Sequence, residues 1–149
     1  MNRELVIDAK SGDVEIALLE EKQLVELHKE RSDQQYQVGD IYLGKVRRIM
    51  SGLNAAFVDV GYEKDAFLHY LDLGPQVRSL QKYVKLATTA RTSFPALENF
   101  KLEKDIEKTG KITGVLKSNQ YILVQIEKEP ISSKGPRVSS EISFAGRYI

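Results

Sequence analysis

Asn54-Ala55-Ala56-Phe57-Val58-Asp59-Val60 is the stretch that decides the fold, because its side chains alternate as those of a half-buried β-strand do. The even-numbered positions 56, 58 and 60 form a clean apolar face. A second stretch, Asp65-Ala66-Phe67-Leu68-His69, repeats the alternation after the short segment Gly61-Tyr62-Glu63. Two such strands around a short loop that contains glycine predict a β-hairpin.

Phe57 and Phe67 fall on the face of this hairpin that points away from the predicted core. Either ring alone is best explained as an ordinary surface aromatic or as one packed under a neighbouring loop. Two rings on one face, with four cations nearby in the sequence, instead indicate a platform on which unpaired bases stack. These cations are Lys45, Arg47, Arg48 and Lys64.

The register of the hairpin follows from the same alternation. If Phe57 lies directly opposite Phe67, then Asp59 lies opposite Asp65 and residues 61–63 form a three-residue loop. A slip of one residue would mix the core and solvent faces, which the hydrophobic pattern opposes. Two carboxylates without histidine or cysteine support are poor evidence for a metal site, so we expect none at Asp59 and Asp65.

The flanking segments extend the β pattern. Residues 4–9, 14–19 and 24–27 predict a β-meander, and residues 32–35 read as a polar linker. In the next strand Ile41 and Leu43 share one parity while Val46 has the other, so a β-bulge is expected at Gly44. Three coiled strands joined in this way form the front half of an OB-type barrel.

The second half of the chain interrupts this pattern and then returns to it. Val77, Leu80, Val84 and Ala87 are spaced for one face of a helix, and residues 88–111 read as a charged surface insertion. Residues 121–126 predict the strand that closes the barrel, residues 130–137 a loop, and residues 142–144 the start of one more strand. That last apolar pattern is unfinished at Ile149, which suggests a larger protein.

Composition limits the possible functions. The chain has 149 residues, no cysteine, two histidines and a net charge of +1, from 22 Lys and Arg against 21 Asp and Glu. Disulfides and thiolate metal sites are therefore excluded. The sequence shows no membrane span and no signal peptide, which fits a cytoplasmic protein. The near-neutral charge predicts that any nucleic-acid binding relies on a local patch together with stacking.

Three segments together resemble the bacterial ribonuclease E/G family. They are residues 39–46 (Gly-Asp-Ile-Tyr-Leu-Gly-Lys-Val), residues 55–68 with their Ala-Ala-Phe-Val-Asp-Val-Gly and Ala-Phe-Leu sequences, and residues 134–149. The resemblance implies a mainly β fold in which residues 37–128 form an S1-type OB domain of five strands with a helical insertion at about 74–111. It assigns residues 1–36 and 129–149 to strands of an incomplete RNase-H-like subdomain.

The resemblance also implies roles for individual residues. Phe57 and Phe67 match the RNA-stacking aromatics of the family, Lys134 matches a basic residue beside them, and Lys45 and Arg47 supply a basic patch. His69 either stacks on a base or caps its strand. Gly146 matches the start of the family's pocket for a 5′-monophosphate, whereas Val60 stands where some members have a further aromatic.

The catalytic part of the family lies elsewhere. The carboxylates that hold Mg²⁺ and the Cys-x-x-Cys zinc link belong to a downstream domain, so we expect this 149-residue segment to be inactive as a nuclease. The whole protein is expected to be a Mg²⁺-dependent endoribonuclease and a homo-oligomer that processes RNA.

Three functions remain open from the sequence. The leading hypothesis is single-stranded RNA binding by part of an endoribonuclease. The alternatives are a stand-alone S1-type RNA-binding module and an OB-fold module for protein interaction or dimerisation, because OB barrels bind many ligands.

Overall fold

The structure is a computed structural model that describes residues 2–10, 13–31, 35–89 and 100–146. The chain separates into two compact units, Met1–Gln35 and Tyr36–Ile149. Each unit is described by itself.

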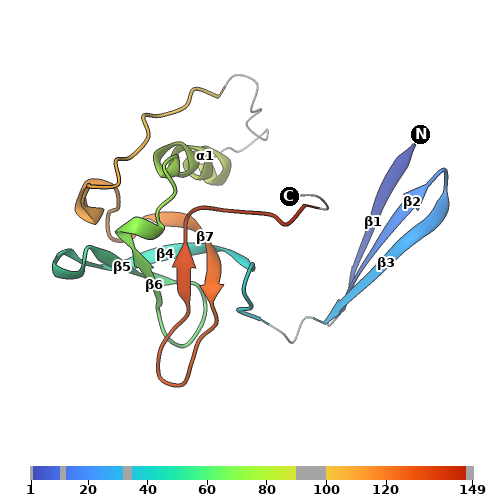
Figure 1. Cartoon of the computed structure of the whole chain (residues 1–149), viewed down its shortest axis with the longest axis horizontal. Helices are drawn as coiled ribbons and strands as arrows, with labels where there is room; N and C mark the ends of the chain where they lie inside the picture. Colours follow the sequence, from blue (N-terminus) through green and yellow to red (C-terminus); the bar gives the residue numbers. More distant parts are fainter. Residues whose placement is uncertain (1, 11–12, 32–34, 90–99, 147–149) are drawn as a thin grey trace. The chain divides into compact units, whose positions relative to one another are not determined.

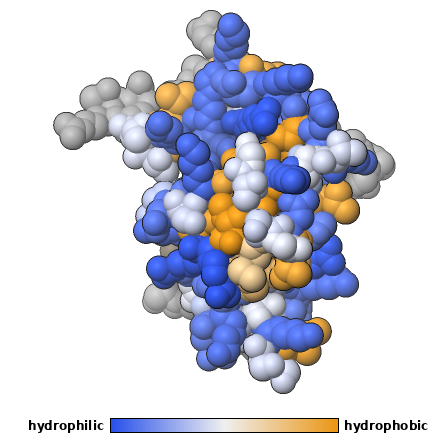
Figure 2. All heavy atoms as spheres, turned by 90° about the vertical axis from the view of Figure 1, so that its left-hand side faces the viewer, coloured by the Kyte–Doolittle hydropathy of each residue, from blue (hydrophilic) through white to orange (hydrophobic). Residues whose placement is uncertain are grey.

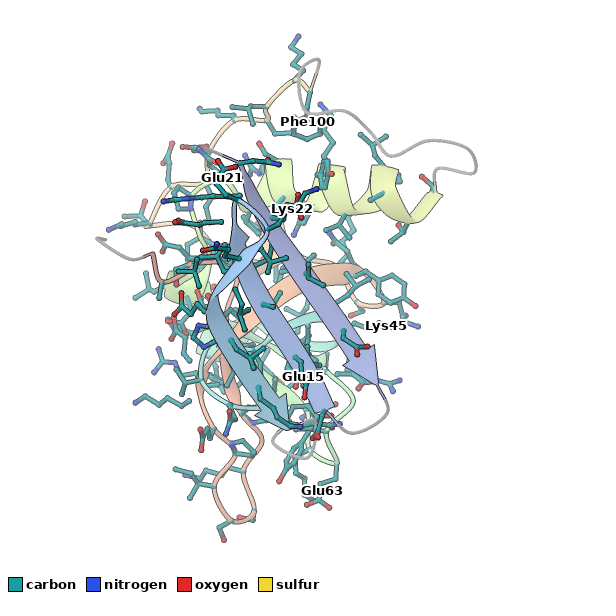
Figure 3. The ribbon with its side chains drawn as sticks, turned by 90° about the vertical axis from the view of Figure 1, so that its right-hand side faces the viewer. Glu15, Glu21, Lys22, Lys45, Glu63 and Phe100 are labelled. Carbon is teal, nitrogen blue, oxygen red and sulfur yellow. The ribbon has the colours of Figure 1, made fainter. Side chains whose placement is uncertain are left out.

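The first unit is a three-stranded antiparallel sheet in the order β1-β2-β3, which confirms the predicted meander. Its strands are β1 (Arg3–Lys10), β2 (Asp13–Glu20) and β3 (Gln23–Arg31). Glu21 and Lys22 form the turn between β2 and β3 with positive φ values of 49° and 65°, the conformation that a tight hairpin requires (Figure 3). Strand β3 continues to Arg31, several residues beyond the predicted end at residue 27.

The second unit is a closed five-stranded barrel, so the predicted mainly β, OB-type fold with a helical insertion is confirmed (Figure 1). Its strands are β4 (Ile41–Met50), β5 (Ala55–Asp59), β6 (Ala66–His69), β7 (Tyr121–Lys128) and β8 (Arg137–Ser139). Around the barrel they follow the order β4-β5-β6-β8-β7. The pairing of β6 with β8 is parallel, and the other pairings are antiparallel.

The barrel encloses one apolar core. Ala56 and Val58 are fully buried and Val60 is nearly so, as the alternation predicts. They pack with side chains from the other strands and from the insertion: Val46, Ala66, Leu68, Tyr70, Leu73, Val77, Ile112, Leu116, Ile122, Val124, Ile126 and Val138. Burial of this apolar surface is the main force that holds the barrel together.

The inward face of β4 differs from the prediction. Gly44 and Val46 point inward, whereas Leu43 remains 48% exposed. The bulge lies between Val46 and Arg48 and not at Gly44. Gly44 serves a different purpose: a Cβ there would lie 2.5 Å from Cγ1 of Val58, so only glycine lets β4 approach the β5 side chains.

The fifth strand of the barrel, β8, is not located by the sequence pattern. β8 begins at Arg137, at the end of the predicted loop, and residues 142–144 form no strand. The buried side chain of Gln125 holds residues 142–144 by hydrogen bonds to the backbone of Ser143, in place of pairing with another strand. Its Oε1 accepts from the backbone N–H of Ser143 at 2.9 Å, and its Nε2 donates to the Ser143 carbonyl at 2.8 Å. Because β8 lies between β6 and β7, the barrel includes residues beyond 128, the position at which the predicted domain ends.

The helical insertion begins with α1 (Val77–Thr89), which confirms the predicted helical face: Val77 and Val84 are almost completely buried. Residues 100–111 return along α1, where the Ser79 hydroxyl accepts from the backbone N–H of Glu103 at 2.8 Å. Short 3-10 helices, η1 (Ser51–Leu53), η2 (Tyr70–Asp72) and η4 (Ile112–Gly114), complete the unit. Pro95 and its neighbours, residues 90–99, lie outside the described residues.

The face of the protein drawn in Figure 2 is mostly hydrophilic, with apolar residues gathered near its centre. Among the described residues, no helix has the length and apolar character needed to cross a lipid bilayer.

Candidate nucleic-acid interface

The two predicted stacking residues lie side by side on the outer face of the barrel. Phe57 of β5 is directly opposite Phe67 of β6, as the alternation predicts. Their ring centroids are 5.8 Å apart at an interplanar angle of 71°, an edge-to-face arrangement. Both residues are half-buried, so each keeps part of its surface available to a ligand.

A cation flanks this aromatic pair on each side. Arg48 of β4 is paired with Phe57, and Arg137 of β8 is paired with Phe67. The guanidinium carbon of Arg48 lies 4.8 Å from the centroid of the Phe57 ring, within cation–π distance. We call the four residues Arg48, Phe57, Phe67 and Arg137 the aromatic row; it crosses four neighbouring strands.

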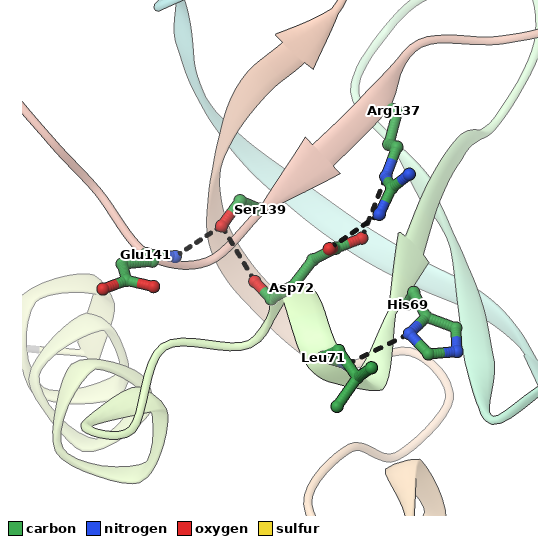
Figure 4. A network of polar contacts seen from close by, with 6 residues as sticks. All are labelled: His69, Leu71, Asp72, Arg137, Ser139 and Glu141. Atoms are coloured by element: carbon green, nitrogen blue, oxygen red, sulfur yellow. Dashed lines mark hydrogen bonds and ion pairs between the residues drawn. The ribbon is translucent and has the colours of Figure 1, made fainter. Parts of the chain in front are cut away.

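Arg137 is fixed by a bidentate ion pair with Asp72 (Figure 4). The two nitrogen–oxygen distances are 3.1 and 2.8 Å, and only 12% of the Asp72 side chain is exposed. The hydrogen bond and charge of Asp72 raise the pKa of Arg137. Because the Ser139 hydroxyl also donates to the Asp72 carbonyl, this contact secures β8 against η2.

His69 has a structural partner. Its Nδ1 accepts a hydrogen bond from the backbone N–H of Leu71 at 3.1 Å, so the imidazole caps the start of η2 (Figure 4). This cap is at η2 and not at the strand, and the stacking of His69 on a base stays a prediction.

Lys45 and Arg47 do not both face the rings. Arg47 donates to the carboxylate of Asp59 through Nε at 3.1 Å and through its terminal nitrogen. Lys45 is paired with Asp59 of β5 and with Tyr121 of β7, and its ammonium lies 6.0 Å from the centroid of the Tyr121 ring. The bulge in β4 brings Arg48 to Phe57, so Arg48 is the one of these β4 cations whose guanidinium lies over a ring.

The predicted pairing of Asp59 with Asp65 is wrong. The ladder between β5 and β6 ends at Val58 and Ala66, and the connection runs over residues 60–65 instead of three residues. On the other edge of β5, Asp59 is paired with Lys45 of β4. Its carboxylate accepts a hydrogen bond from the backbone N–H of Gly61 at 2.9 Å. That hydrogen bond and the Arg47 guanidinium lower the pKa of Asp59.

This lowered pKa gives a pH prediction. A carboxylate with a depressed pKa in the folded state stabilises the fold above its unfolded pKa of about 4, and this contribution is lost as the pH falls through the folded pKa. Asp59→Asn is therefore expected to lower the free energy of unfolding by about 1 kcal/mol at pH 7 and by less at pH 3. Urea unfolding at both pH values measures the difference.

Asp105→Asn is the matched control, because Asp105 is exposed and forms no hydrogen bond or ion pair with any described residue. Its effect on stability is expected to be near zero at both pH values. A loss of stability in Asp59→Asn that is equal at pH 7 and pH 3 would show that the charge of Asp59 does not stabilise the fold.

Lys134 lies in a tight turn in which Ile131 and Lys134 exchange backbone hydrogen bonds of 3.2 and 3.0 Å. The following Gly135 packs so closely on the loop between β5 and β6 that an added Cβ would overlap the carbonyl oxygen of Asp65. Next, the Pro136 carbonyl accepts from the N–H of Phe67 at 2.8 Å. The chain thus holds exposed Lys134 beside the strand of Phe67.

Some residues predicted from the sequence are not brought to the aromatic row. Gly146 is exposed at the end of the described chain, outside any helix or strand. Within residues 2–10, 13–31, 35–89 and 100–146, no group of three His, Asp or Glu side chains could hold a metal ion.

Sequence comparison decides the family. Ribonuclease G of Escherichia coli (strain K12) is 30% identical over all 149 residues, which are 27% of that protein's length. Ribonuclease G of Haemophilus influenzae is 33% identical over 98% of this chain and 26% of its own length. Ribonuclease E of Synechocystis is 40% identical over 76% of this chain and 13% of its own length.

The chain belongs to the ribonuclease E/G family. It spans about a quarter of the length of the ribonuclease G relatives. No protein-family model matches the sequence.

Proposed function

We propose that the barrel of this ribonuclease E/G segment is an S1-type module that binds single-stranded RNA on the aromatic row. Phe57 and Phe67 stack on two successive bases, and Lys45, Arg48 and Lys134 contact phosphates. The observation that carries the proposal is the direct cross-strand pairing of two half-buried rings with a guanidinium over one of them. Such a surface has the properties of a sequence-tolerant stacking platform.

Stacking supplies more of the binding energy than charge does in this proposal. Base–aromatic stacking is worth about 1–3 kcal/mol per base. Arg47 and Arg137 are already held in ion pairs with Asp59 and Asp72, so fewer cations are available to phosphates. The net charge of +1 agrees with a modest electrostatic contribution.

The salt dependence of binding follows from the available cations. If Lys45, Arg48 and Lys134 each contact one phosphate, log K is expected to fall with log[salt] at a slope near −2, from about −0.7 per phosphate on single strands. Fluorescence anisotropy of a labelled oligouridylate of about 4 nucleotides, short enough to occupy one site, measures the slope at several salt concentrations. A flat response would contradict phosphate contact by these side chains.

Competition with duplex RNA tests the proposed ligand. An excess of unlabelled single strand is expected to displace the labelled oligouridylate, whereas a duplex of the same length is expected to displace it poorly, because paired bases cannot stack on the rings. Equal competition by both would contradict the proposal.

Light scattering tests the alternative protein-interaction function. In that case the rings would be buried between two copies of the chain, and adding RNA would leave the measured molecular mass unchanged.

The activity of the whole protein is also a proposal. Membership in the family supports an endoribonuclease that processes RNA in the cytoplasm, as a homo-oligomer, with this segment delivering RNA to a Mg²⁺-dependent site. The carboxylates for that site and the ligands for Zn²⁺ would lie in the part of the relatives' sequence that this chain does not span. Gly146 would begin the pocket for a 5′-monophosphate.

A further inference from the structure

A basic groove lies on the same barrel, between α1 and the loop that leads into β7. It has a volume of about 790 Å³. Among the residues that the structure describes, four cations line it, Arg78, Lys82, Lys85 and Lys117, against one carboxylate, that of Glu103. The groove therefore carries a marked positive charge in a chain whose net charge is only +1.

Most of this positive charge is available to a ligand. Lys82 is engaged, because its ammonium binds the carboxylate of Glu103 at 2.7 Å and the carbonyl of Lys101 at 2.8 Å. Within the described parts of the chain, the side chains of Arg78, Lys85 and Lys117 form no hydrogen bond or ion pair. Arg78 and Lys85 are seven residues apart on α1, so they lie on the same face of the helix.

Tyr121 connects the groove to the aromatic row. It lines the groove, it is 51% exposed, and it is paired with Lys45, which is itself paired with Asp59 of β5. Only β4 therefore separates Tyr121 from the strand of Phe57, a distance of about 10 Å across the sheet. The Lys45 ammonium near the Tyr121 ring places a cation and a third stacking surface between the two sites.

We infer that single-stranded RNA bound on the aromatic row continues across Lys45 and Tyr121 into this groove. Tyr121 stacks on a base, and Arg78, Lys85 and Lys117 contact the phosphates that follow. The groove is thus a second subsite that extends the length of RNA held by the barrel. This inference rests on the proposed function, because the row must bind RNA for the strand to continue from it.

Oligonucleotide length separates the two sites. Labelled oligouridylates of about 4 and about 12 nucleotides both fall within the range of site sizes known for OB folds, about 4–16 nucleotides. The 149-residue chain is expected to bind the longer one more tightly. The triple variant Arg78→Gln, Lys85→Gln, Lys117→Gln is expected to lose about tenfold in affinity for the long oligonucleotide, through the lost phosphate contacts, and to bind the short one as the parent does.

A second triple variant controls for total charge. Lys104→Gln, Lys108→Gln, Lys111→Gln removes three exposed cations that do not line the groove. It is expected to change the affinity for both oligonucleotides by less than about twofold, since it only weakens the general field of the protein. Equal losses in the two triple variants would overturn the groove, because the effect would then be one of net charge.

Tyr121→Ala tests the connection, with Phe144→Ala as a control at another exposed aromatic. Tyr121→Ala is expected to weaken binding of the long oligonucleotide about tenfold through lost stacking, and Phe144→Ala to leave it unchanged. If the parent chain binds both lengths equally, the groove inference fails while the aromatic row stands. If the parent chain binds neither, the proposed function and the groove fail together.

Discussion

Phe57→Ala and Phe67→Ala are each expected to weaken the binding of single-stranded RNA by about tenfold or more. Each ring presents one stacking surface, and the loss of one base–aromatic stack costs about 1–3 kcal/mol. The two rings are also edge-to-face neighbours, so each substitution removes one aromatic pair worth about 0.5–1.5 kcal/mol of fold stability. Anisotropy titration with a labelled oligouridylate measures the affinity, and urea unfolding measures the stability.

Two control variants separate stacking from burial. Phe57→Leu keeps an apolar side chain but lacks an aromatic face, so it is expected to preserve stability better than affinity. Val58→Ala removes methyl groups from a fully buried side chain and is expected to lower stability by about 1 kcal/mol or more while leaving affinity near the parent value. A Phe→Ala chain that unfolds more easily but keeps the parent affinity would show that the rings serve the core.

The hairpin could be predicted because its information is local. A strand has a side-chain period of two, so the alternation around Val58 and Leu68 decides which residues face the core and also which residues are opposite one another. The loop length could not be predicted in the same way. Asp59 forms its contacts with Arg47 of β4 and with Gly61, and the choice between these partners and Asp65 depends on a strand that lies outside the hairpin.

The position of the fifth strand depends on contacts that are distant in sequence. Only three residues, Arg137–Ser139, pair in β8, and their partners are Phe67 in β6 and residues 125–128 in β7. A segment this short has no periodicity of its own. Residues 142–144 have a stronger strand pattern, but the side chain of Gln125 already binds the backbone of Ser143.

The same limit applies to the site. Their positions in the sequence make Lys45, Arg47 and Arg48 equally good candidates for contact with the rings, because all three lie in one strand. The bulge after Val46 decides which of them meets Phe57, and the Asp59 carboxylate decides that Arg47 is held away from it. Arg137 lies within the matched segment 134–149, but its position beside Phe67 follows from the pairing of β8 with β6, which the sequence does not reveal.

Gly135→Ala is expected to be the most damaging change of a single small residue at the site. An added Cβ would overlap the carbonyl oxygen of Asp65 and would lie 2.9 Å from that of Lys64, and neither backbone atom can rotate away as a side chain does. The turn that carries Lys134 would have to move off the loop between β5 and β6. Overpacking of this kind costs about 1–3 kcal/mol, measured as a lower urea midpoint.

The substitution acts on RNA binding as well as on stability. Gly135 precedes Pro136, whose carbonyl accepts from the N–H of Phe67, so displacement of the turn shifts both Lys134 and the end of β8 relative to the ring. The affinity for single-stranded RNA is therefore expected to fall even at temperatures where the variant is fully folded. Lys134→Gln removes one phosphate contact without any steric change, so its affinity for single-stranded RNA is expected to fall by less than that of Gly135→Ala.

Gly52→Ala is the matched control, because an added Cβ at Gly52 would meet no atom within 4 Å. Its urea midpoint and its RNA affinity are expected to stay within about 0.5 kcal/mol of the parent, as for most surface substitutions. If Gly135→Ala behaves like Gly52→Ala in both measurements, the turn does not pack on the hairpin. Lys134 would then be free of the strand of Phe67, and its contribution to the RNA site would have no structural basis.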